Sequence, residues 1–131
     1  MSASDYLEEE ILDHIFGKGT YTPPTIHVAL CTASIDEDDT GSTITEANYT
    51  GYSRYETEAA DWSRSNSVMS NASALTFDEC TAGSSTVSHV ALVDAASAGN
   101  LLFYAQLTSN LSVSDGIEPY FAIGDITVTA S

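Results

Sequence analysis

The chain has 131 residues, of which 43% are hydrophobic. This is enough for one domain with its own core, and it excludes a wholly disordered protein. Nineteen acidic residues against three basic ones give a net charge of −16, which leaves no basic patch to neutralise phosphates and therefore disfavours a nucleic-acid partner. No apolar run approaches the roughly 18 residues of a membrane span, so we expect no membrane insertion.

The excess of acid has two interpretations. With Lys18 as the only lysine, the composition favours a halophilic setting, in which salt screens the self-repulsion of the fold. The alternative is an acidic surface that keeps the protein soluble and discourages wrong association. There is no basic segment followed by an apolar one of the kind found in secretory signals, so we expect assembly in the cytoplasm of a host cell.

The first predicted element is an amphipathic helix over about residues 4–16. Ser4 is a suitable N-cap, acidic residues fill the first turn, and Gly17 can end the helix in a left-handed conformation. A helix this short is marginal alone in water, so its apolar stripe has to pack on the chain's own sheet or on a partner. We take this stripe as the candidate assembly interface; it consists of Leu7, Ile11, Leu12, Ile15 and Phe16.

The stretch from residue 25 to 32 alternates in a way that is typical of a strand. Ile26, Val28 and Leu30 are expected to face the core, with His27 and Ala29 on the other side. The stretch from 61 to 71 is polar, with Trp62 as an isolated anchor. Further strands are expected at residues 51–57, 74–77, 86–93, 101–107, 111–113, 119–123 and 126–129.

A long acidic loop is expected between the first two strands, at about residues 33–51. Loops of this length in a compact domain are usually functional or mobile. We therefore take the loop and the aromatic residues beside it as a candidate outward or binding face, and the alternative is that the aromatic residues belong to the core. The residues of this candidate face are Asp36, Asp38, Asp39, Tyr49 and Tyr52.

No metal site is predicted. The acidic run that begins at Asp36 resembles the start of a calcium loop, but its twelfth position is Ala47, where a bidentate glutamate is needed. The three histidines and two cysteines show no ligand spacing. Cys31 and Cys80 are expected to be buried free thiols, with one disulfide as the alternative.

No catalytic motif is found either. The chain has no Gly-x-Ser-x-Gly elbow, no glycine-rich phosphate loop and no pair of carboxylates placed for acid–base work. We therefore expect a protein that is not an enzyme and that needs no cofactor. A hydrolase would require a cleft with convergent titratable groups.

The frequent short strands and turns predict a mainly β fold, an antiparallel β-sandwich of jelly-roll-like character with one N-terminal α-helix. Serine and threonine are abundant, which suits strands and turns better than helices. No internal repeat or linker divides the chain. A single domain over residues 1–131 is expected.

Several sequence segments together resemble a small virion structural protein family of tailed phages, whose members are often labelled tail fibre proteins. The N-terminal motif carries most of this resemblance, and the strand motifs add to it. The segments are Ser4-Asp5-Tyr6-Leu7-Glu8, His14-Ile15-Phe16-Gly17, Tyr21-Thr22-Pro23-Pro24, Val28-Ala29-Leu30-Cys31-Thr32, Gly51-Tyr52-Ser53-Arg54, Trp62, Val87-Ser88-His89-Val90-Ala91-Leu92-Val93-Asp94-Ala95-Ala96, Gly99-Asn100-Leu101-Leu102-Phe103-Tyr104 and Phe121-Ala122-Ile123-Gly124-Asp125-Ile126-Thr127-Val128.

The resemblance implies a non-enzymatic structural protein of the virion. A small domain without shaft-like repeats suits a capsid decoration or turret-like module on the virion surface, and the alternative is a tail fibre or tail-tip component that binds a host receptor or glycan. The expected partners are further copies in a symmetric homo-oligomer and other capsid or tail proteins. The helix and the first strand are the expected contact between copies.

Overall fold

The computed structural model describes residues 1–130 and shows a mainly β protein with one α-helix near its N-terminus. All paired strands are antiparallel. The elements are β1 (Ser2–Ala3), α1 (Asp5–Ile15), β2 (His27–Cys31), β3 (Tyr55–Glu56), the 3₁₀ turn η1 (Ala59–Asp61), β4 (Trp62–Ser65), β5 (Val68–Asn71), β6 (Leu75–Thr76), β7 (Ser85–Val93), β8 (Leu101–Val113), β9 (Tyr120–Phe121) and β10 (Thr127–Thr129). The predicted mainly β, antiparallel class with an N-terminal helix is confirmed.

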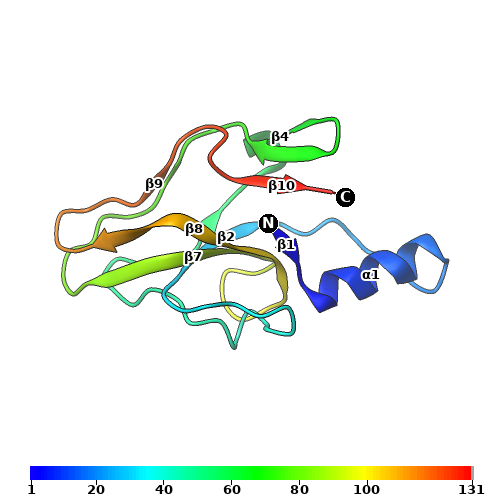
Figure 1. Ribbon diagram of the computed structural model, residues 1–131, viewed down its shortest axis with the longest axis horizontal. Helices are drawn as coiled ribbons and strands as arrows, with labels where there is room; N and C mark the ends of the chain where they lie inside the picture. The colour runs from blue at the N-terminus through cyan, green and yellow to red at the C-terminus, as the bar shows by residue number, and fades with distance from the viewer. Residues whose placement is uncertain (131) are drawn as a thin grey trace.

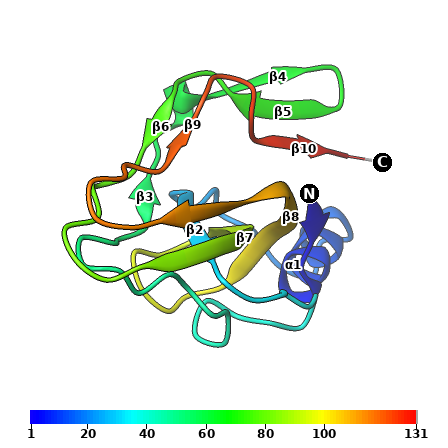
Figure 2. The same cartoon turned by 60° about the vertical axis from the view of Figure 1, so that its left-hand side comes forward.

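The strands form two layers. The main sheet has five strands in the order β1-β8-β7-β2-β3, with the long β7–β8 hairpin at its centre. A three-stranded sheet, β10-β5-β4, and the pair β6-β9 lie over one face of this main sheet (Figures 1 and 2). The chain therefore encloses a core between the layers, as a sandwich does.

The main core fills the space between these layers. Val28 and Leu30 on β2 point into it, as the alternation predicted, and both are fully buried. Phe77 and Phe121 come from the opposite layer, and their rings meet edge to face with centroids 6.1 Å apart. Such aromatic packing adds specific geometry to simple burial.

A second core lies on the other face of the main sheet, where the alternation of residues 25–32 had placed Ala29 away from the core. Ala29 and Cys31 on β2 pack there, together with Ile35 and Ile44 from the segment between β2 and β3. This segment covers the sheet with its apolar residues, while Asp36, Glu37 and Asp38 stay exposed. Because both faces of β2 are covered, every residue of that strand is buried.

Three element predictions were wrong. The strand expected at residues 51–57 is reduced to β3, and the short strand expected at 111–113 is the end of β8. The polar stretch from 61 to 71 forms the β4–β5 hairpin, in which a two-residue turn is made with Asn66 at φ +54°. Asn tolerates this left-handed conformation, and tight hairpin turns require it. The sequence did not indicate this strand pair, because β4 is mostly solvent-exposed and its residues are therefore polar.

The predicted helix caps are present. Ser4 is buried, and its hydroxyl accepts a hydrogen bond from the Leu7 backbone N–H at 3.2 Å and donates one to the Leu101 carbonyl. Gly17 follows the helix at φ +73°, in the left-handed region. Because β1 pairs with β8 directly before the cap, the N-terminal end of α1 is fixed to the edge of the main sheet.

Candidate functional site

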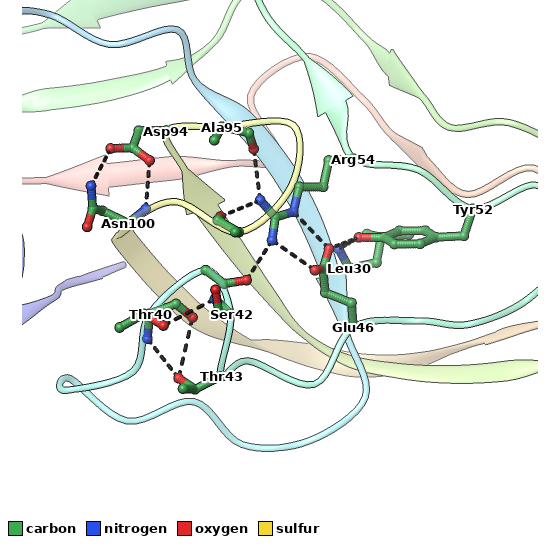
Figure 3. Close-up of polar contacts among 12 residues, drawn as sticks. Leu30, Thr40, Ser42, Thr43, Glu46, Tyr52, Arg54, Asp94, Ala95 and Asn100 are labelled. Atoms are coloured by element: carbon green, nitrogen blue, oxygen red, sulfur yellow. Dashed lines mark hydrogen bonds and ion pairs between the residues drawn. The ribbon is translucent and has the colours of Figure 1, made fainter.

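A cluster of polar contacts surrounds the side chain of Arg54 (Figure 3). Its guanidinium donates to Glu46 through Nε and Nη2, at 3.0 and 2.9 Å. Nη1 donates to the carbonyls of Ala95 and Ala98, and Nη2 also donates to that of Gly41, at 2.8–2.9 Å. All five donors of the guanidinium are therefore satisfied within the chain.

Tyr52 completes this cluster. Its hydroxyl donates to Glu46 Oε1 at 2.6 Å and accepts from the Leu30 backbone N–H at 3.1 Å. Burial and the neighbouring carboxylate raise the pKa of Tyr52. Burial disfavours the charged form of Glu46, but the hydrogen bonds from Arg54 and Tyr52 outweigh it and hold the pKa of this carboxyl below its usual value.

The Arg54 cluster therefore has a structural role. The Arg54 side chain is 3% exposed. Because all five of its N–H donors are already used, none is left for a substrate or ligand. What the cluster does is join two segments that are distant in the sequence, the β2–β3 connection, which contains Gly41, Glu46 and Arg54, and the β7–β8 turn. The sequence had shown Arg54 as one of three basic residues and as part of the Gly51-Tyr52-Ser53-Arg54 segment, but not as the centre of a cluster.

Tyr49 and Tyr52 do not belong to an outward face, which corrects their predicted placement. Tyr49 is 3% exposed and packs edge to face on Tyr52, with centroids 5.6 Å apart. The hydroxyl of Tyr52 points to the buried Leu30 backbone. Both rings belong to the main core, to which the segment before β3 contributes few other apolar side chains.

The acidic residues predicted with them do lie at the surface. Asp36 and Asp38 are exposed, and Asp39 is half-buried because its carboxylate accepts from the Asp36 backbone and the Thr43 hydroxyl. Asp36, Asp38 and Asp5 border a concavity of about 440 Å³. Within residues 1–130, no three His, Cys, Asp or Glu side chains are grouped so that they could hold one metal ion.

Both cysteines are free and buried. Burial and the charge of Glu46 raise the pKa of the Cys31 thiol to about 12. A thiol in this state is a poor nucleophile, because the thiolate is the reactive form. In the part of the chain that is described, no helix is long and apolar enough to cross a bilayer.

The residues of the predicted assembly interface are buried at the start of α1 and exposed in its second half. Leu7 is 5% exposed and packs on the chain's own core. Ile11, Leu12, Ile15 and Phe16 are exposed, the last two by 70% and 72%. Figure 1 shows the reason: α1 projects beyond the end of the main sheet, so only its first turn has a surface to pack against.

An apolar groove lies between the two layers and was not predicted. It measures about 610 Å³, and its walls come from the segment before β2 and from both sheets. Arg64 on β4 also lines it and is exposed. The alternation of Trp62 and Arg64 with serines was the available signal, but it requires the β4–β5 hairpin to be recognised. The principal apolar residues are Pro24, Ile26, Trp62, Met69, Phe103 and Val128.

Comparison with known proteins gives one finding. The family model Gp80, described as podophage GP4 fiber I protein gp80, matches residues 2–129, which is nearly the whole chain. No curated protein matches it.

Proposed function

Because the chain belongs to the Gp80 family of podophage fiber I proteins, we propose that it is a non-enzymatic structural protein displayed on the surface of a phage particle. The saturated Arg54 cluster and the inert buried thiols support a structural role. So does the position of the exposed large apolar residues, since four of the eight lie together at one projecting helix.

The exposed half of α1 is the observation that carries this proposal. Four large apolar side chains in six residues face solvent on a helix that is otherwise acidic. Exposed apolar patches mark surfaces that other proteins cover. The proposed role of α1 is to join copies of the chain into a symmetric homo-oligomer within the virion.

Two placements on the particle are proposed. A tail position is supported by the family description, which names a fiber protein. A capsid decoration or turret-like position is supported by the short two-layer fold, which has no repeated shaft. Labelling intact particles with antibody against the exposed turn at residues 114–116 distinguishes them, because label on the capsid excludes the tail placement and label on the tail excludes the capsid placement.

Self-association is tested with the double substitution Ile15→Ser and Phe16→Ser. Both residues are more than two-thirds exposed, so the fold should be retained. Burial of one such side chain is worth about 1.5–3 kcal/mol, so each substitution should weaken association by about 10- to 100-fold. The measurement is sedimentation equilibrium over a range of protein concentrations.

Ile123→Ser is the matched control. This residue is also 67% exposed, but it lies between β9 and β10. It should leave association unchanged. Equal effects of the control and the α1 substitutions, or a monomeric wild type at all concentrations, would contradict the proposed role of α1.

A further inference from the structure

We propose that the exposed half of α1 in one copy lies in the apolar groove of a second copy. This inference rests on the self-assembly part of the proposed function and names the contact that produces it. Each copy then donates one helix and accepts one. Docking of an amphipathic helix into a hydrophobic groove is a common recognition mode.

The exposed half of α1 cannot lie in the groove of its own copy. Leu7, Ile11 and Ile15 follow one another at four-residue spacing on one face, and their exposed fractions rise from 5% to 47% to 70%. The stripe therefore leaves the body of the protein progressively. No residue of α1 lines the groove, and moving α1 there would break the two hydrogen bonds that Ser4 donates to the Leu101 and Leu102 carbonyls.

The groove has the size and chemistry to receive this stripe. Its volume of about 610 Å³ lies within the range of roughly 300–1,000 Å³ typical of sites that enclose an apolar ligand. Phe103 lines it from the main sheet and Val128 from the three-stranded sheet, and Met69, which is 37% exposed, is an adaptable side chain at the surface.

Charge selects a second copy as the occupant. With Arg54 enclosed, Lys18 and Arg64 are the two exposed cations of the chain. Arg64 lines the groove, whereas Glu56 and Glu58 border the concavity that continues from it along Pro23, Pro24 and Trp62. The groove thus has a basic end and an acidic end.

The helix has the matching pattern. Glu9 and Asp13 are exposed on α1, and Lys18 follows its end. A helix that places Glu9 and Asp13 near Arg64 and Lys18 near Glu58 satisfies both ends of the groove. In a molecule of net charge −16, other body surfaces repel this acidic helix, so the complementarity fixes both the site and the direction of docking.

The test uses two single variants, Leu12→Cys on α1 and Met69→Cys in the groove. Both side chains are exposed, and the native Cys31 and Cys80 are fully buried. The two variants are mixed and treated with a short bismaleimide reagent. A link between positions 12 and 69 in this mixture can only join two different copies, and peptide mass spectrometry identifies it.

The expected result is a 12–69 link in the mixture and its absence when Ser114→Cys replaces Met69→Cys. Ser114 is exposed just beyond the end of β8 that is remote from Phe103. Arg64→Glu should weaken association more than about tenfold because it places like charges across the contact. Ser114→Glu, which also adds a negative charge, should leave association unchanged.

Three results would overturn this inference. A 12–12 link without a 12–69 link shows helices paired with each other. A mixture that is oligomeric by sedimentation but gives no 12–69 link places the contact elsewhere and leaves the self-assembly proposal standing. A mixture that stays monomeric and unlinked removes both proposals.

Discussion

At the scale of single residues, Arg54 shows how a rare side chain organises this fold. Three basic residues serve a chain with nineteen acidic ones, yet one of the three is enclosed and binds only a single carboxylate. Its other partners are backbone carbonyls of connecting segments. A planar fork with five donors suits this task, which a lysine could not perform.

Replacing Arg54 by Met should therefore lower the free energy of unfolding by about 3–5 kcal/mol, because three carbonyls lose a donor and Glu46 loses its cation and keeps only the hydrogen bond from Tyr52. Arg64→Met is the matched control. Its side chain is exposed, so the change should stay within about 0.5 kcal/mol in dilute solution. Urea unfolding followed by circular dichroism measures both, and similar losses in the two variants would refute the structural role of Arg54.

The lowered pKa of Glu46 makes a related prediction about pH. A carboxyl whose pKa is lower in the folded state stabilises the protein above its unfolded pKa of about 4.3, and this contribution is lost as pH falls through the folded value. The stability difference between wild type and Glu46→Gln should therefore shrink below about pH 4.3. Urea unfolding from neutral to acidic pH measures it; a constant difference would show that Glu46 does not titrate with folding.

At the scale of elements, the segment between β2 and β3 is the most informative. Its acidic composition indicated a solvated loop, but Ile35 and Ile44 make it the cover of the second core. Its position is held by a close backbone contact, in which the Gly41 N–H donates to the Gly99 carbonyl at 3.0 Å. A Cβ atom at Gly41 would lie 1.9 Å from the Ala98 carbonyl oxygen.

Gly41→Ala should accordingly destabilise the protein by about 1–3 kcal/mol, because a backbone turn has to move. Gly19→Ala is the control, since a Cβ there would meet nothing closer than 3.6 Å. Thermal unfolding of the two variants measures the difference. Equal melting temperatures would mean that the backbone contact between Gly41 and the β7–β8 turn can be changed without loss of stability.

At the scale of the whole molecule, the dominant property is charge. Net charge −16 on 131 residues implies self-repulsion that salt relieves, because the screening length falls to about 3 Å at 1 M. The halophilic interpretation predicts a melting temperature that rises steadily from low to molar salt. Calorimetry on wild type and on the Ile15→Ser/Phe16→Ser variant separates the effect of salt on the fold from its effect on assembly. A melting temperature that stays constant or falls with salt in both proteins would exclude the halophilic interpretation.

The sequence by itself determined the features that depend on neighbours along the chain. The Ser4 cap, the helix ending before Gly17, the β2 strand and the mainly β class all follow from local hydrogen bonding and periodicity. Periodicity states which residues share a face of an element. It does not state what, if anything, covers that face.

Only the tertiary structure decided which faces are covered. Tyr49 and Ala29 are buried because segments distant in the sequence pack on them, whereas Ile15 and Phe16 stay exposed because α1 extends past the sheet. The groove and the Arg54 cluster arise in the same way, from residues of several elements brought together. A side chain is buried only when another surface packs on it, and the tertiary structure determines which surface that is.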